Sequence, residues 1–142
     1  MSLSESFIEI AQFTKTLLSR CAEKHGLTHQ QIILLNNIPA LDGISISDLS
    51  KRIGIDISTL SRNLKKMEGK NLTKRQKCGS DSRSYKIYIT NDGERIVVNA
   101  INDFDVLMSN TLNSMNLSIS SSFVQNIDRI SWELYKSINC EK

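Results

Sequence analysis

Apolar residues recur at steps of three and four over most of the chain, which predicts a mainly helical protein. The first such stretch covers residues 3–25, and Gly26 is expected to end it in the left-handed conformation. A second helix is predicted from Thr28, whose hydroxyl can serve as the N-cap, to about residue 38. The N-terminal third of the chain is therefore expected to form a pair of helices.

Two further amphipathic stretches occupy the C-terminal third, over residues 91–115 and 119–139. Thr90 and Ser118 stand where an N-cap is expected for each. Both stretches, like residues 3–25, carry apolar stripes wide enough to serve a core and a partner chain together.

Between these helices, residues 45–70 read as helix, tight turn, helix. Ser45 followed by Asp48 indicates a capping box that opens the first of them, and Gly54 closes it. The second starts at Asp56 or Ser58, and its predicted inner face consists of Ile57, Leu60, Leu64 and Met67. Asn71 follows as the non-glycine residue best suited to a left-handed cap.

The apolar period then changes from 3.6 to 2. Residues 85–90 alternate in the manner of a half-buried strand, and residues 72–78 are a suitable partner strand. Gly, Ser and Asp in residues 79–84 are typical of a hairpin tip. The predicted fold is mainly α with a small β-hairpin wing, a winged helix-turn-helix, in one domain over residues 1–142.

A helix-turn-helix places its second helix in the major groove of duplex DNA, where outward side chains meet base edges and phosphates. Arg62 and Asn63 suit bidentate pairing with guanine and adenine, whereas Lys65 and Lys66 suit phosphates. Asp56 is interpreted as a cap and not as a contact. The full predicted outward set is Ser58, Thr59, Ser61, Arg62, Asn63, Lys65 and Lys66.

The hairpin adds a second predicted contact surface. Arg83 at the tip could enter a narrow minor groove, with Asp81 orienting its guanidinium; both could equally be ordinary turn residues. The basic residues of the wing are Lys74, Arg75, Lys77, Arg83 and Lys86.

The distribution of charge agrees with a DNA partner. Residues 51–90 contain eleven Lys or Arg against three Asp or Glu, a balance of +8, whereas the two flanking segments are each net acidic. Such a block suits a polyanion because phosphate neutralisation releases counterions. A solvated basic face without a partner would give the same count.

These residues resemble the MarR family of bacterial transcription regulators. The helix-turn-helix resembles the family in its Ser58-Thr59 pair, Arg62 and Glu68. The wing resembles it in four more residues, Asp81, Arg83, Thr90 and Gly93. Three positions depart from the pattern: Ser50 for Ala, Asn71 for Gly and Ser82 for Arg.

The resemblance implies a homodimer that binds a palindromic DNA operator, in most members as a repressor. It implies a DNA-binding lobe over about 28–90 and dimerisation helices at about 3–25, 91–115 and 119–139. It also implies that a small aromatic or anionic effector releases the DNA. Candidates for lining its pocket are Phe13, His29, Ile33 and Phe104, for which ordinary core roles remain the alternative.

The cysteines leave another alternative open. Three of them do not form a disulfide framework. Cys78 near the wing tip lies among cations that would favour a thiolate, so a redox-responsive regulator is one hypothesis and an inert thiol the other. Cys21, His25 and His29 repeat at steps of four, but Gly26 interrupts that face. We therefore expect neither a metal nor a cofactor.

Other function classes find less support. The chain has no phosphate-binding loop, no GxSxG, no HExxH and no CxxC, so an enzyme is not expected. A winged-helix module for protein–protein contacts is the remaining rival. No apolar run approaches the ~20 residues of a membrane span and no secretory signal is seen, so we expect a cytoplasmic protein without a membrane partner.

Overall fold

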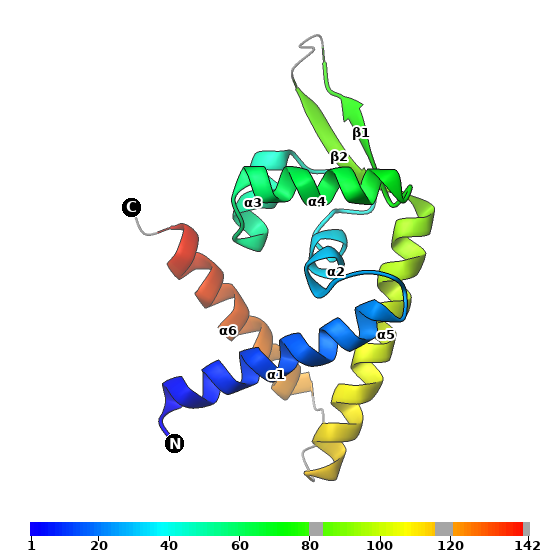
Figure 1. The fold of residues 1–142 in the computed structure, drawn as a ribbon. Coiled ribbons are helices and arrows are strands. Elements are labelled where there is room, and N and C mark those ends of the chain that lie inside the picture. The colour runs from blue at the N-terminus through cyan, green and yellow to red at the C-terminus, as the bar shows by residue number, and fades with distance from the viewer. Residues whose placement is uncertain (80–83, 116–120, 141–142) are drawn as a thin grey trace. The chain divides into compact units, whose positions relative to one another are not determined.

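The computed structural model describes residues 1–79, 84–115 and 121–140. Within them lie six helices and one two-stranded antiparallel hairpin (Figure 1). The predicted fold class, mainly α with a small hairpin, is confirmed. The elements are α1 (Leu3–Glu23), α2 (His29–Asn36), α3 (Ile46–Ile53), α4 (Ile57–Gly69), β1 (Thr73–Lys77), β2 (Tyr85–Ile89), α5 (Asn91–Ser114) and α6 (Ser121–Asn139).

The chain divides into two compact units, Met1–Phe104 and Asp105–Lys142. The first unit contains α1 to α4, the hairpin and the first half of α5. The second contains the rest of α5 and α6. None of the helices in the described segments is both long and apolar enough to cross a bilayer.

Helix ends follow the local chemistry of the sequence. Thr28 and Gln31 form a complete capping box, with the Gln31 amide donating to Thr28 Oγ1 at 3.2 Å and the Thr28 amide to Gln31 Oε1 at 3.1 Å. At Ser45 the structure shows one half of the predicted box, because Ser45 Oγ accepts from the Asp48 amide at 3.1 Å. In a full box the side chain of the third helical residue also accepts from the amide of the N-cap residue. Asp48 is one methylene shorter than the usual Glu, which explains why, in this described segment, its carboxylate does not accept from the Ser45 amide.

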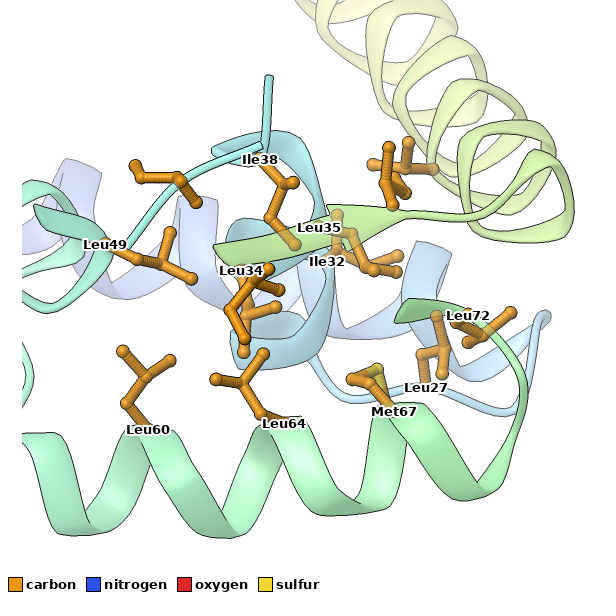
Figure 2. Packing of buried hydrophobic residues seen from close by; sticks show 14 of the residues in the cluster. Leu27, Ile32, Leu34, Leu35, Ile38, Leu49, Leu60, Leu64, Met67 and Leu72 are labelled. Atoms are coloured by element: carbon orange, nitrogen blue, oxygen red, sulfur yellow. The ribbon is translucent and has the colours of Figure 1, made fainter. Parts of the chain in front are cut away.

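The core of the first unit lies beneath α4. Leu60, Leu64 and Met67 are fully buried, and Figure 2 shows them directed from one side of α4 toward the leucines of α2. Their spacing of four and three residues is the helical period that the sequence predicted. The prediction for Ile57 was wrong: this residue is 50% exposed. It is the first residue of α4, and burial along the helix begins one turn later, at Leu60.

The hairpin is anchored to the helices at its base. Thr73 pairs with Ile89 and Lys77 with Tyr85. Ile87 also exchanges two backbone hydrogen bonds with Ile44, of 2.9 and 2.8 Å, which adds a bridge from the segment between α2 and α3. Ile87 and Ile89 are buried as predicted, so the base of the wing belongs to the core.

The start of α5 is packed closely against the start of the wing. Thr90 acts as the predicted cap, accepting from the Gly93 amide at 3.0 Å while its hydroxyl donates to the Asn71 carbonyl at 2.8 Å. Gly93 leaves no room for a side chain, because a Cβ there would lie 2.3 Å from the Leu72 carbonyl oxygen and 2.8 Å from Ile89 Cγ1.

The substitution Gly93→Ala is therefore expected to destabilise the protein by about 1–3 kcal/mol, since the obstructing atom belongs to the backbone. Gly69→Ala is the matched control: this glycine is helical and a Cβ on it would meet nothing within 4 Å. That variant should gain about 0.5–1 kcal/mol. Urea unfolding at one protein concentration measures both, and equal free energies for the two variants would contradict the close packing at Gly93.

The second unit has no buried side chain on α6. The predicted cap Ser118 lies outside the described residues, and α6 begins at Ser121. Trp132 and Tyr135 stack with ring centroids 5.5 Å apart. The exposed large apolar residues of α6 are Val124, Ile127, Ile130, Trp132, Leu134 and Ile138.

Candidate nucleic-acid interface

A tight turn joins α3 to α4. Gly54 ends α3 with φ of 70°, in the left-handed region that the sequence predicted. The Ser50 hydroxyl donates to the Ile55 carbonyl at 2.6 Å and so spans the turn. The serine at this position thus adds a hydrogen bond to the helix-turn-helix.

One face of α4 points away from the core and carries the predicted contact residues. Thr59, Arg62, Asn63, Lys65 and Lys66 line a shallow hollow of about 570 Å³ on this face. Arg62 and the two lysines are exposed, whereas Thr59 and Asn63 are half-buried. Ser58, which is exposed, and Ser61, which is half-buried, complete the set. The structure thus brings the predicted set together on one helix surface, and its contact with DNA stays a prediction.

Asp56 organises the N-terminus of α4. Its carboxylate accepts from the Ser58 hydroxyl, from the Thr59 amide at 3.0 Å and from the Thr59 hydroxyl at 2.7 Å. These bonds, led by that from Ser58, hold the pKa of Asp56 well below its usual range. Thr59 Oγ1 in turn accepts from Arg62 Nη2 at 3.4 Å, so a chain of contacts runs from the cap to the Arg62 guanidinium.

Because the pKa of Asp56 is lower in the folded protein, its contribution to stability is present above the ordinary Asp pKa of about 3.9. That contribution is lost as the pH falls further, through the depressed folded-state value. Asp56→Ala should therefore lower the free energy of unfolding at pH 7 and differ less from the wild type at pH 3. Urea unfolding at both pH values measures this. A difference of equal size at pH 3 and pH 7 would contradict the role of the ionised cap.

The wing carries several of its predicted cations in exposed positions. Lys74, Arg75 and Lys77 are exposed on β1. Lys86 is half-buried, with Nζ 3.5 Å from the Asp42 carbonyl oxygen. Asp81 and Arg83, with the rest of residues 80–83, lie outside the described residues, so their predicted roles stay predictions.

Three further cations of the basic block had no role assigned by the sequence pattern. Lys51 and Arg52 are exposed in the last turn of α3, next to the turn into α4. Their membership of the basic block was a signal that could have found them. Lys70 follows α4, and its Nζ donates to the Gly26 carbonyl oxygen at 2.7 Å. Lys70 thus links the end of α4 to the segment between α1 and α2.

The four candidate effector residues occupy three helices. His29 and Ile33 are half-buried one turn apart on α2, Phe104 is half-buried on α5, and Phe13 is 59% exposed on α1. Partial burial and, secondarily, the charge of Lys15 lower the pKa of His29, which favours its neutral form. The pocket stays a prediction.

The cysteines are in different surroundings. Cys21 is fully buried, as expected for a structural thiol. Cys78 is half-buried with Sγ 4.0 Å from the Gln76 carbonyl oxygen, and its redox role remains untested. Across residues 1–79, 84–115 and 121–140, no group of three or more His, Cys, Asp or Glu could hold a metal ion. His25 Nε2 instead lies 3.5 Å from Asp103 Oδ2.

Helices α3 and α4 are joined at a left-handed glycine, the outer face of α4 is basic, and a β-hairpin follows α4 in the chain. Together these features define a winged helix-turn-helix protein. A model of the MarR family matches residues 27–85. The HTH-type transcriptional regulator SarZ of Staphylococcus haemolyticus is 32% identical over an alignment of 111 residues that covers 71% of this chain and 76% of that protein. The chain belongs to the MarR family, whose members are transcriptional regulators and not enzymes.

Solved structures share the fold. The Staphylococcus aureus MepR–DNA complex is 24% identical with a TM-score of 0.74, covering 96% of this chain and 98% of that one. NadR in complex with 4-hydroxyphenylacetate is 18% identical with a TM-score of 0.79, covering 96% and 94%. At these identities the likeness concerns the fold.

Proposed function

We propose that the protein is a homodimeric repressor that binds a palindromic double-stranded DNA operator and is released by a small molecule. The observation that carries the proposal is the outer face of α4, where Arg62, Asn63, Lys65 and Lys66 gather on one helix surface. A major groove about 12 Å wide admits one helix, and this set combines base-reading groups with phosphate-binding groups.

The wing supplies the second contact of each subunit in this proposal. Exposed Lys74 and Lys77 on β1 suit the DNA backbone, and Arg83 suits the minor groove. Lys51 and Arg52 extend the same basic surface to the end of α3. The crystallised complex of MepR with DNA supports DNA as the partner of this fold.

The apolar surface of the helices outside the DNA-binding lobe supports the dimer. On α6, Ile127, Ile130 and Leu134 recur at steps of three and four while remaining at least 42% exposed. On α1, Phe7, Ile10 and Phe13 are exposed at steps of three. Large apolar side chains left in water along a helical stripe are typical of a protein interface. A dimer also gives two half-sites one helical turn apart, which multiplies specificity.

The effector part of the proposal depends on Phe13, His29, Ile33 and Phe104. The two phenyl rings and the Ile33 side chain suit an aromatic ring, and the N–H of the His29 imidazole can donate to an anionic group. The complex of NadR with 4-hydroxyphenylacetate supports that ligand class. Two measurements with 4-hydroxyphenylacetate and related acids test this part. Thermal-shift titration identifies the acids that bind, and an operator-binding assay then shows whether those acids release the DNA. A stabilising acid that leaves operator affinity unchanged would contradict release by that compound, because coupling requires a difference in affinity between two states.

Selection of bound sequences from a random duplex DNA pool tests the DNA-binding part. Enrichment of a palindrome whose half-sites are about 10 base pairs apart, centre to centre, is the expected result. Enrichment of sequences without two-fold symmetry would contradict binding by a symmetric dimer. Recovery of no preferred sequence would favour the protein–protein module.

A further inference from the structure

The guanidinium of Arg75, in the wing, is engaged within the protein. Its Nε forms an ion pair with Glu68 Oε1. Its Nη1 donates to the Tyr85 hydroxyl at 3.3 Å, and its Cζ lies 5.0 Å from the centroid of the Tyr85 ring. One guanidinium therefore contacts a carboxylate and an aromatic side chain together.

The three residues belong to three different elements. Glu68 lies in the last turn of α4, Arg75 is the central residue of β1, and Tyr85 opens β2. Only the segment Lys70–Leu72 connects α4 to β1, and Asn71 within it has φ of 58°. Figure 1 shows the hairpin extending away from that end of α4. The cluster thus joins the helix to the hairpin above the point where the chain turns.

The bridge to Ile44, in the segment between α2 and α3, is made by β2. The two bonds between Ile87 and Ile44 fix β2 at its middle, and Arg75 is the residue of β1 that pairs with Ile87. Two-stranded hairpins are marginally stable alone. The orientation of β1, and of the end of the hairpin where Lys77 pairs with Tyr85, therefore depends on contacts such as those of Arg75 with Glu68 and Tyr85. Lys77 and residues 80–83 lie beyond this cluster along the chain.

We propose that Glu68, Arg75 and Tyr85 form a brace that sets the orientation of the wing relative to α4, so that Arg75 is a positioning residue and not a phosphate contact. This inference rests on the proposed DNA-binding function. It replaces the sequence-based interpretation of Arg75 as a DNA contact. That interpretation rested on the charge of Arg75, and the pairing with Glu68 is evident only in the structure. The planar guanidinium suits the role because it can pair with a carboxylate and stack on a ring in one geometry.

The two roles of Arg75 make opposite predictions for Glu68→Gln. If Arg75 binds phosphate, removing a nearby carboxylate leaves the surface more positive, and affinity for DNA rises. If the brace operates, weakening its charged hydrogen bond lets the wing reorient. Affinity for the operator then falls by about 3- to 10-fold, the scale expected for one charge-assisted hydrogen bond.

Arg75→Lys gives the companion test, because lysine keeps the charge but not the planar fork. The brace predicts a fall in affinity similar to that of Glu68→Gln, and both variants should keep the wild-type slope of log affinity against log salt. Lys77→Gln is the control on the same strand. It removes an exposed charge and should reduce the magnitude of that slope by about 0.9 for each phosphate that Lys77 neutralises in the wild type.

Fluorescence anisotropy with the selected operator, at several salt concentrations, measures these affinities. Glu68→Gln protein that binds as tightly as the wild type, or more tightly, would overturn the brace while leaving the proposed function intact. Wild-type protein that binds no duplex DNA would instead overturn the proposed function.

A readout without DNA keeps the brace testable in that case. Amide hydrogen exchange in Thr73–Lys77 and Tyr85–Ile89 should be faster in Glu68→Gln than in the wild type, because the hairpin is then tied less firmly to α4. Unchanged exchange in both strands would overturn the brace.

Discussion

Replacing Arg62 with Ala is expected to lower operator affinity by about 30-fold to 20,000-fold. Each Arg–guanine bidentate pair contributes about 1–3 kcal/mol of discrimination, and a symmetric dimer has two copies. Arg62 is the exposed guanidinium of the α4 outer face, and its contact with Thr59 links it to the capped start of the helix. Competitive binding to operator and to operator variants measures the fall in affinity and the relaxed preference at one base pair in each half-site.

Arg20→Ala is the matched control for this change. Arg20 is also exposed, but it lies in the last turn of α1, outside the basic block of residues 51–90. Its removal changes the net charge equally and should leave operator affinity within about 2-fold. The double variant with Arg62→Ala and Arg83→Ala should abolish operator binding while sedimentation still reports a dimer. Binding that survives the double change would mean that another surface reads the DNA.

Placing aspartate on the apolar stripe of α6 is expected to lower operator affinity by a similar factor, because it should dissociate the dimer. In the variant with Ile130→Asp and Leu134→Asp, two carboxylates would have to be buried in the proposed dimer interface without partners, which is strongly unfavourable. The dimer should dissociate at micromolar concentration. Operator affinity should then fall by about 100-fold to 10,000-fold, because the second half-site no longer benefits from being linked to the first.

Sedimentation equilibrium and operator binding on the same samples measure both consequences. Gln125→Asp provides the control, since Gln125 is exposed on another face of α6 and the substitution adds one carboxylate to the same helix. It should leave both the dimer and the affinity unchanged. A dimer that persists in the doubly substituted protein would place the interface elsewhere.

The sequence predicted the ends of several helices well because these ends are determined by local chemistry. Gly54 and Asn71 both adopt positive φ, as predicted. Thr28 caps α2 and Thr90 caps α5, as the sequence also predicted. These features depend on a residue and its near neighbours in the chain, so spacing alone could identify them.

Burial at the edge of an element was harder to predict. Ile57 continues the apolar period of α4, yet the packed core begins at Leu60. Periodicity assigns a face to a helix but does not say how far along that face the neighbouring layer extends.

Side-chain pairing across elements could not be predicted from a single sequence. The pairing of Glu68 with Arg75 depends on where β1 begins relative to the last turn of α4, and that of Lys70 with Gly26 joins residues 44 positions apart. Charge counting therefore assigned Arg75 to DNA, because its local sequence looks like that of the neighbouring lysines.

Titration of the wild-type protein with duplex DNA over a range of salt concentrations tests the central claim most directly. The claim is that residues 51–90 form a surface that reads duplex DNA. The predicted result is binding at low ionic strength with log affinity falling linearly against log salt, by about 0.9 for each phosphate neutralised. Affinity for duplex DNA that is undetectable at low ionic strength, or insensitive to salt, would contradict the account.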